Sequence, residues 1–404
     1  MRPGLICHFR GTSRKLTANL SGSAFLCYST LKKHQMRKQE TRRKAIFETL
    51  RAEIRSGRHV SSERFPSETA LARRFACSRQ TVVHALLSLE DLGLVCRRRG
   101  AGTFLTKKAR RFGASIGLIL PGIGCGEIFP PISQEISRLA QKEGMTLLFG
   151  GDPSRSAAVR AERTRELARQ FVEKGVAGVI FQPMEFFEQS AHYNQEVVAI
   201  FTAARIPVVL IDCDIVPSPQ RSACDVVGVN NFDIGRTLAR HMLERGARHV
   251  RVLRRPLCAT TVMNRILGVQ TVLGAPRIED FTVTAEPSDE TAIRRALRGR
   301  KGADAFICGN DAVASHLLVT LRRIGKRVPE DVLVAGVDDV EHATLVTPPL
   351  TTIHQPCEAI AATAFHFLLS RIDDPSLPAR ECLLPAPLVV RSSTASRPPK
   401  LGLT

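Results

Sequence analysis

Residues 66–105 limit how this chain can fold more than any other stretch, because two helical apolar patterns in it are each preceded by a capping serine. The Ser67 hydroxyl is placed to accept a hydrogen bond from the unpaired amides of a first helical turn, and Leu71 and Phe75 then recur four residues apart. Ser78 follows after a two-residue turn and is placed to cap another helix. The pattern predicts two short helices joined by a tight turn, the first running from Ser67 to Phe75.

The second of these helices has an apolar side and a polar side. Val82, Leu86 and Leu89 fall on the side that faces inward, and Gly93 ends the helix. Four polar residues lie toward solvent near its amino end, namely Arg79, Gln80, Thr81 and His84. Side chains of these types hydrogen-bond to base edges and phosphates, so this helix is a candidate for contact with DNA.

A two-stranded ribbon is predicted after the second helix. Residues 94–96 and 103–105 can pair, and residues 97–102, with three arginines and two glycines, form the tip. A tip of this composition suits phosphates or a minor groove. Two helices followed by a ribbon make a winged helix-turn-helix, a module whose main use is to place one helix in the major groove of DNA.

The stretch resembles the DNA-binding domain of the GntR family of bacterial regulators, over residues 40–106. The likeness rests on the motifs PSE, LA, SR.TV, AL..LE..GL and G.GTF, in order and at the family's spacing. Thr69 and Val83 depart from the pattern, because the family often has arginine there, and the operator sequence therefore stays open. The resemblance implies that Arg79, Thr81, Arg99 and Gly100 contact DNA. With the helix pattern, the candidate DNA contacts are Ser67, Arg79, Gln80, Thr81, His84, Arg98, Arg99 and Gly100.

The distribution of charge supports the same interpretation. Residues 1–112 contain 25 Lys and Arg but 7 Asp and Glu, so they carry +18 of the net charge of +20. The remaining residues are nearly balanced. Basic residues often form no more than a solvated surface, but so uneven a distribution is typical of a nucleic-acid-binding segment.

Length and composition set further limits. At 404 residues the chain is too long for one ordinary core, and no run of about 18 apolar residues predicts a membrane span. The 11 cysteines show no metal-ligand spacing, so we expect reduced thiols in a cytoplasmic protein without a metal or cofactor. The predicted boundaries are a basic, disordered arm or start-site artefact over 1–38, the winged helix over 39–106, a linker over 107–113, a sensor over 114–392 and a tail over 393–404.

The composition of the arm leaves one alternative. Residues 1–35 contain no Asp or Glu and are basic, a composition that also occurs in organellar transit peptides. Met36 stands just before the first convincing helix, which favours an arm or an upstream start codon.

From Ala114 onward, apolar runs of strand length alternate with helical stretches. SIGLIL, MTLLF, VAGVIF and IPVVLID form one series of strands, and CDVVGV, HVRVL, DFTVT, ADAFICG and DVLVAGV form a second. Strands that are apolar on both faces favour a doubly wound parallel sheet. The sequence predicts an α/β domain of two lobes, with a ligand cleft at the carboxyl ends of the strands.

The order of these elements resembles the LacI/GalR type of periplasmic-binding-protein-like sensor over residues 114–392. The motifs are VGVNN with Gly235, NRILGV, FICGNDAVA, RVPEDVLVAGVDD and PPLTTIHQP. Together with a GntR-type head, and with IFPPI at 128–132, the chain looks like the AraR subgroup of sugar-responsive repressors. The resemblance implies an effector site built from Asp212, Asn230, Arg265, Asp311, Asp338 and Gln355, to which Phe129 adds an apolar wall.

The chemistry of this set suits a small polyol or sugar. Carboxylates accept from paired hydroxyls, and the Arg265 guanidinium donates as a fork. Each residue also has a structural interpretation, since Asp311 and Asp338 can cap helices, Asn230 can sit in a turn, and Arg265 can pair with a carboxylate.

Three other functions compete with this one. An α/β enzyme is not favoured, because GxSxG, P-loop and HExxH motifs are absent. A transport-linked solute-binding protein is not favoured by the DNA-binding head. A sensor for a purine rather than a sugar stays open, since no Trp, 2 Tyr and 19 Phe give no decisive cue. We expect a homodimeric repressor of a double-stranded DNA operator, controlled by a small carbohydrate and without a membrane partner.

Overall fold

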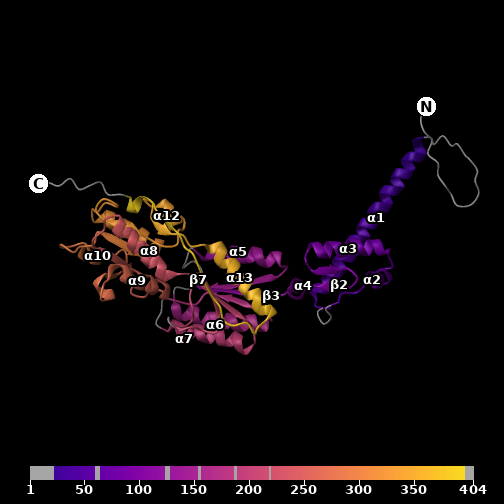
Figure 1. The fold of residues 1–404 in the computed structure, drawn as a ribbon, viewed down its shortest axis with the longest axis horizontal. Helices are drawn as coiled ribbons and strands as arrows, with labels where there is room; N and C mark the ends of the chain where they lie inside the picture. Colours follow the sequence, from indigo (N-terminus) through magenta and orange to yellow (C-terminus); the bar gives the residue numbers. More distant parts are fainter. Residues whose placement is uncertain are drawn as a thin grey trace, which may run out of the picture. The chain divides into compact units, whose positions relative to one another are not determined.

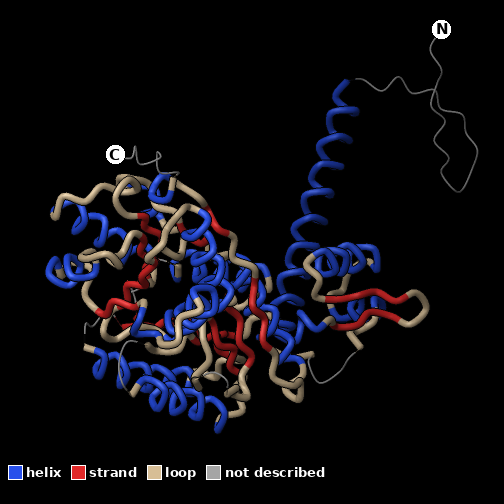
Figure 2. Tube along the Cα trace, turned by 60° about the vertical axis from the view of Figure 1, so that its left-hand side comes forward, coloured by secondary structure: helices blue, strands red, loops and turns tan. Residues whose placement is uncertain are grey.

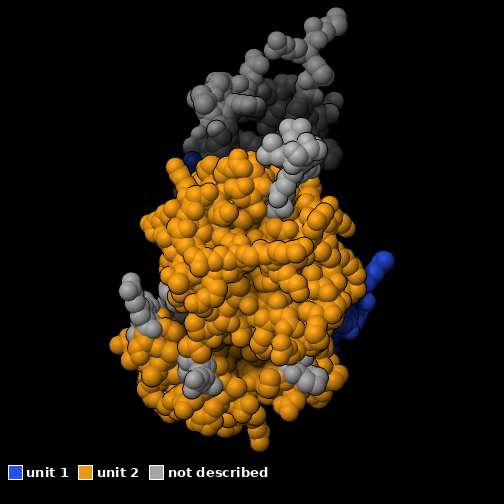
Figure 3. All heavy atoms as spheres, turned by 90° about the vertical axis from the view of Figure 1, so that its left-hand side faces the viewer, with its two compact units in different colours: residues 1–110 blue, residues 111–404 orange. Residues whose placement is uncertain are grey.

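The computed structural model describes residues 22–59, 64–122, 128–152, 156–185, 189–217 and 220–395. The chain divides into two compact units, residues 1–110 and 111–404 (Figure 3). Both units match the predicted fold class, a helix-turn-helix with a small wing and two lobes of parallel sheet. Each unit is described below by itself.

The first unit consists of helices followed by one hairpin. Its elements are α1 (Gly22–Arg55), α2 (Glu68–Arg74), α3 (Arg79–Asp91), β1 (Val95–Arg98), β2 (Gly102–Leu105) and the start of α4 (Lys107–Arg111). The two strands pair antiparallel, with Val95 opposite Leu105 and Arg98 opposite Gly102. Figure 2 shows them as a red hairpin with a tan turn. Buried residues from α1, α2, α3 and the wing make the core, namely Ile46, Leu50, Ile54, Leu71, Val82, Leu86, Leu89 and Leu94.

The structure differs from the expected boundaries of this unit in two places. Residues 22–38, which we expected in a disordered arm, continue α1 toward its amino end, and residues 1–21 of that arm lie outside the described part. The segment expected as a linker over 107–113 contains α4. This helix forms because the Thr106 hydroxyl accepts a hydrogen bond from the Ala109 amide at 3.1 Å, as a helix cap does.

The first lobe of the second unit is a sheet of six parallel strands in the order β13-β7-β6-β5-β3-β4. Its strands are β3 (Ser115–Gly122), β4 (Thr146–Asp152), β5 (Val179–Phe181), β6 (Val208–Ile211), β7 (Asp225–Val229) and β13 (Glu381–Leu384). Helices α5 (Phe129–Lys142) and α13 (Cys357–Asp373) cover one face, and α6 (Ala157–Glu173) and α7 (Ser190–Ala203) cover the other (Figure 1).

The prediction for β7 was wrong in one respect. We assigned CDVVGV to the second series of strands, but β7 pairs with β6 and β13 in the first lobe. The chain leaves the first lobe after this strand, so the strand pattern alone cannot tell to which sheet it belongs.

The second lobe holds a smaller parallel sheet in the order β11-β10-β8-β9. Its strands are β8 (Val250–Arg254), β9 (Thr282–Thr284), β10 (Ala305–Cys308) and β11 (Leu333–Ala335). Its helices are α8 (Asn231–Glu244), α9 (Thr260–Leu273), α10 (Glu290–Ala296), α11 (Asp311–Arg323) and α12 (Glu341–Leu345), with a 3₁₀ turn at Ile278–Asp280.

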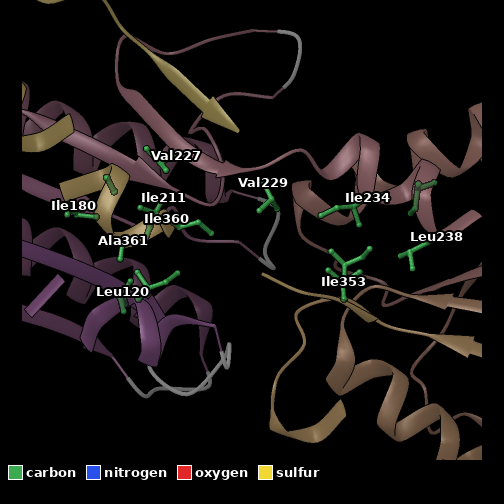
Figure 4. Close-up of a cluster of buried hydrophobic side chains, with 14 of the residues drawn as sticks. Leu120, Ile180, Ile211, Val227, Val229, Ile234, Leu238, Ile353, Ile360 and Ala361 are labelled. Atoms are coloured by element: carbon green, nitrogen blue, oxygen red, sulfur yellow. The ribbon is translucent and has the colours of Figure 1, made fainter. Parts of the chain in front are cut away.

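The chain crosses between the lobes three times. It passes from β7 to α8, returns from β12 (Thr352–Ile353) to α13, and crosses again from β13 to β14 (Leu388–Val389). Strands β12 and β14 pair antiparallel. Buried apolar residues continue through this region, where Figure 4 shows Val229 between a group of first-lobe side chains and Ile234, Leu238 and Ile353.

The end of the second unit also differs from the expected boundary. We placed a tail from residue 393 onward, but Ser393 and Thr394 are both 0% exposed and belong to a 3₁₀ turn (Ser392–Thr394). The Ser393 hydroxyl donates to the Val334 carbonyl at 2.7 Å and accepts from the Thr351 amide at 2.8 Å. These bonds hold the segment on the second lobe. Residues 396–404 of the expected tail lie outside the described part.

Candidate DNA interface and effector cavity

Two serines set the start of α2 and of α3, as the sequence predicts. The Ser67 hydroxyl accepts from the Ala70 amide and the Ser78 hydroxyl from the Thr81 amide, each at 3.2 Å. Each bond satisfies an amide that a first helical turn leaves without a partner. Ser67 was also a candidate DNA contact, and it remains exposed while it caps α2.

The turn between these helices is held from α1. Ala76 has a φ of +45°, a conformation that residues other than glycine rarely adopt. Arg42 of α1 donates to the Ala76 carbonyl at 2.5 Å and to the Phe75 carbonyl at 3.3 Å. The angle between α2 and α3 is therefore fixed by contacts outside the two helices.

A buried carboxylate links α1 to α2 in the same unit. Glu53 of α1 is 8% exposed, and it accepts from Arg74 of α2 at 2.9 Å, from Arg58 at 2.9 Å and from His59 at 3.1 Å. The hydrogen bonds from Arg74 lower the pKa of Glu53 to about 2, against the opposing effect of burial. Glu53 thus stays ionised at neutral pH and joins α1 to α2.

The polar side of α3 is available to a partner. Arg79, Gln80 and His84 are exposed, while Thr81 is partly buried. The Arg79 Nε atom donates to Glu68 of α2 at 2.8 Å, and Arg97 of the wing donates to the other oxygen of that carboxylate. The hydrogen bond from Arg79 is the main cause of the lowered pKa of Glu68.

The wing differs slightly from the predicted ribbon. The strands extend to Arg98 and start again at Gly102, so the turn is shorter than the predicted tip. Arg98, which we placed in the tip, lies in β1, and its guanidinium stacks 4.9 Å from the centre of the Phe104 ring. Arg99 and Gly100 occupy the turn and are exposed, with a φ of +76° at Gly100. Only glycine adopts this conformation without strain.

The second unit contains a cavity of about 490 Å³ lined by residues of both lobes. Five of the seven effector candidates line it, namely Phe129, Asp212, Arg265, Asp338 and Gln355. Phe129 and Asp212 come from the first lobe, and Arg265 from α9 of the second. The cavity lies where β6 and β8 end, which is where open α/β sheets bind ligands.

Two candidates, Asn230 and Asp311, lie outside the lining. Asn230 caps α8, since its side-chain oxygen accepts from the Asp233 amide at 3.2 Å. Asp311 is 0% exposed and accepts from the Thr352 hydroxyl at 2.6 Å and from the Val340 amide at 3.2 Å. Burial is the main cause that raises the pKa of Asp311 to about 8. Asn230, expected in a turn, therefore caps a helix, whereas Asp311, expected to cap one, does not, since the Asn310 side chain caps α11. Asn310, the neighbour of Asp311, lines the cavity instead.

Arg265 is held in place before any ligand binds. Its side chain is buried, and it donates from Nε to the Asn231 side-chain oxygen at 2.8 Å and from Nη1 to the Gly309 carbonyl at 2.5 Å. A Cβ atom at Gly235 would lie 2.0 Å from the Arg265 carbonyl oxygen, so this glycine lets α8 approach α9 closely. The Nη2 atom has no hydrogen bond within the described residues.

Two acidic residues of the cavity are electrostatically coupled. Burial, and after it the negative charge of Asp212, raise the pKa of Glu185 to about 7. Burial also raises the pKa of Asp212, while Arg265 opposes that shift. Glu185 follows β5 in the first lobe, and it accepts from the amide and the hydroxyl of Thr260, each at 2.8 Å. Thr260 begins α9, so these bonds join the two lobes.

Three features of the cavity are typical of a binding site. Asp212 and Asp338 have φ values of +74° and +122°, strained conformations that cluster at binding sites. The Gln355 Oε1 atom is buried and lacks a hydrogen-bond partner within the described residues, while its amide donates to Asp338 at 3.3 Å. A buried acceptor without a donor is costly, and a ligand hydroxyl can supply that donor.

The sequence analysis missed several lining residues. They are Arg160, Gln182, Glu185, Arg254, Arg255, Cys258, Thr261 and Asn310. Gln182 and Arg255 directly follow the carboxyl end of a strand, which is a signal that the sequence did contain. The part of the chain that the structure describes holds no cluster of His, Cys, Asp and Glu suited to a metal ion. Within that part, no helix is long and apolar enough to cross a membrane.

Comparisons with known proteins agree with this geometry. Residues 42–105 match the family of bacterial regulatory proteins, gntR family, and residues 239–394 match the periplasmic binding protein-like domain. The HTH-type transcriptional repressor PurR of Salmonella arizonae is 29% identical over 290 residues, which are 70% of this chain and 81% of that protein.

Two solved structures share both fold and sequence with the chain. The transcription regulator GntR from Chromobacterium violaceum is 25% identical with a TM-score of 0.56, over 69% of this chain and 99% of that one. A LacI family regulator from Enterococcus faecalis with bound ribose is 26% identical with a TM-score of 0.58, over 70% and 99%. The chain is therefore a DNA-binding transcription regulator, not an enzyme, that combines a GntR-family helix-turn-helix domain with a LacI-type, periplasmic-binding-protein-like effector domain.

Proposed function

We propose that the protein is a repressor of the AraR type, whose affinity for its operator is controlled by a small carbohydrate. The observation that carries the proposal is the composition of the cavity, where carboxylates, amides and a buried guanidinium come from both lobes and Phe129 is the one aromatic residue of the described lining. Paired acceptors and donors beside an aromatic ring suit a sugar. The ribose-bound relative supports this choice.

The control of DNA binding follows from contacts made by both lobes. A ligand that touches Asp212 of one lobe and Arg265 of the other binds more tightly when the lobes are close. Such a ligand shifts the population toward that state, and the resulting change in DNA affinity is commonly about 1 to 3 kcal/mol.

We further propose that the protein acts as a homodimer joined through its effector domain. The DNA-binding unit is strongly basic, so contact between two copies of it would bring like charges together. Two heads then meet half-sites separated by about 10 base pairs or a multiple. Analytical ultracentrifugation of the full chain and of residues 111–404 checks this, because a monomeric fragment beside a dimeric full chain would contradict it.

Calorimetry with the full chain tests the effector class. The panel consists of D-ribose, L-arabinose, D-glucose and cellobiose, with adenine and hypoxanthine as a second arm. Binding by a sugar, lost in Arg265→Ala and kept in Arg236→Ala, supports the proposal. Arg236 is the matched control, because it lies on α8 with its own ion pair to Asp233 at 3.1 Å and does not line the cavity.

If the effector is a purine, the calorimetry panel should show binding by a base and none by a sugar. A planar base is usually held by stacking on aromatic faces, and the described lining offers one such face, that of Phe129. Binding by adenine or hypoxanthine without binding by any sugar would overturn the carbohydrate proposal.

A further inference from the structure

Arg254 is a partly buried cation at the edge of the effector cavity. It is the last residue of β8, and it lines the 490 Å³ cavity beside Leu253 and Arg255. Its Nε atom donates to the Thr284 hydroxyl at 3.0 Å, and its Nη1 atom lies 3.4 Å from the Met263 sulfur. Two uncharged partners on β9 and α9 thus orient the guanidinium.

The charge of Arg254 is not matched within the described part of the chain, where it makes no ion pair with a carboxylate. Its neighbour Arg255 does, since it lies 3.2 Å from Glu286. Arg254 is partly buried, so its guanidinium loses part of its hydration without gaining a counter-ion, which costs free energy. An anion in the cavity would remove that cost.

The acidic residues of the cavity do not serve as this anion. Glu185 accepts from Thr260, and the charge of Asp212 interacts with Arg265. Asp338 accepts from the Gln355 amide. These carboxylates thus have partners elsewhere in the lining, and none of them forms an ion pair with Arg254.

From this arrangement we infer that the effector carries an acidic group, a carboxylate or a phosphate, which binds Arg254. Arginine suits either group, because its planar fork of N–H donors matches two oxygens of the anion. The inference rests on the proposed carbohydrate function and narrows it, because the effector becomes a sugar acid or a sugar phosphate. The neutral part of the molecule lies against Arg265, Gln355 and Phe129.

A second guanidinium reaches the same cavity from the other lobe. Arg160 belongs to α6 of the first lobe, whereas Arg254 belongs to the second. An anion between them interacts favourably with both lobes, and this interaction grows as the lobes approach. The acidic group therefore contributes to closure as well as to affinity.

Three variants of the full chain test the inference. Arg254→Gln removes the charge and keeps a side-chain donor, and Arg254→Lys keeps the charge without the fork. Arg251→Gln is the matched control, because Arg251 lies on the same strand, donates only to the Val250 and Lys301 carbonyls, and does not line the cavity.

The probes are D-ribose, D-ribose 5-phosphate and D-glucuronate, measured by calorimetry and by melting temperature at matched ionic strength. We expect one of the two anions to bind wild type and Arg251→Gln at least tenfold more tightly than Arg254→Gln, with Arg254→Lys between them. The anion that binds identifies the acidic group as phosphate or carboxylate. The melting temperature without ligand shows whether each variant is folded.

Two results would overturn the inference. The first is that each anion binds wild type and Arg254→Gln with the same affinity, which removes the acidic group from the effector. Alternatively, D-ribose binds wild type and Arg254→Gln equally and at least as tightly as the anions do, which leaves the carbohydrate proposal intact. If adenine or hypoxanthine binds and no sugar or sugar anion does, both the carbohydrate proposal and the acidic-group inference are overturned.

Discussion

The Nε atom of Arg79 lies 2.8 Å from a carboxylate oxygen of Glu68, so the first residue of α3 is tied to the first residue of α2. The Arg79 side chain is nevertheless 73% exposed. An ion pair this exposed contributes less than about 1 kcal/mol, so DNA can replace it at little cost. The pair orients Arg79 without occupying all its donors.

Our first prediction separates α3 from the wing. Arg79→Ala should lose about 1 to 3 kcal/mol of discrimination between operator and random DNA, because an arginine at the amino end of α3 can reach base edges. Arg99→Ala should weaken binding to both DNAs and reduce the salt dependence, because a wing arginine contacts phosphates. Titrations of both variants at several salt concentrations measure these effects. Equal losses on operator and random DNA in Arg79→Ala would contradict the assignment of α3.

The second prediction concerns the stability of the DNA-binding unit. Glu53→Gln should cost about 1 to 3 kcal/mol at neutral pH, because a buried carboxylate with charged donors is replaced by a neutral amide. Since the pKa of Glu53 is lowered from 4.5 to about 2, its contribution is present above pH 4.5 and is lost as the pH falls toward 2. Denaturant unfolding followed across this range checks both statements. The control is Glu48→Gln on the same helix, whose ion pair with Arg51 is exposed and should matter little.

The fold could be predicted where local chemistry decides it. Ser67 and Ser78 cap their helices because a side-chain oxygen must reach a nearby amide, which is a property of adjacent residues. The sheet to which β7 belongs depends instead on where the chain crosses between lobes. Ser393 and Thr394 are buried by contacts with Thr351 and Val334, far away in sequence, and no local pattern marks them.

The third prediction concerns Arg265. Arg265→Ala should bind operator normally but lose about 1 to 3 kcal/mol of effector affinity, because ligand hydroxyls lose a buried donor. Its bonds to Asn231 and Gly309 also disappear, so the melting temperature of the effector domain should fall by a few degrees. Calorimetry beside an operator-binding assay measures both effects. Unchanged effector affinity together with reduced stability would make Arg265 a structural residue.

The fourth prediction is a pH dependence of the effector domain. The pKa of Glu185 is raised from 4.5 to about 7, so its contribution to stability is present below pH 4.5 and is lost as the pH rises through 7. Glu185→Gln should reduce this slope but not abolish it, because the raised pKa values of Asp212 and Asp311 act in the same direction. Melting temperatures between pH 5 and 8 test this. Glu166→Gln, at an exposed ion pair with Arg169, should leave the slope unchanged, and an unchanged slope in Glu185→Gln would contradict the prediction.

Some residues of the effector cavity could be predicted from the sequence, and others could not. Strand ends and family motifs indicate Asp212, Arg265 and Asp338, and these line the cavity. Neighbouring polar residues can differ in role according to where each side chain points: Asn310 caps α11 and lines the cavity, whereas Asp311 points to Thr352 and Val340. The sequence does not contain that direction. Arg254 was missed because an arginine in a strand is usually a surface residue, and its orientation depends on Thr284 and Met263.

The three crossings between the lobes limit what an effector can communicate. Two of them, β12 and β14, are joined by backbone pairing at Thr352 with Val389 and Ile353 with Leu388, which resists sliding and twisting of one lobe on the other. Bending remains as the easy motion, as in other hinged proteins. We therefore expect the lobes to move relative to each other mainly by bending. Effectors of different chemistry should then differ in how far they bend the two lobes together. They should not differ in the direction of that bending.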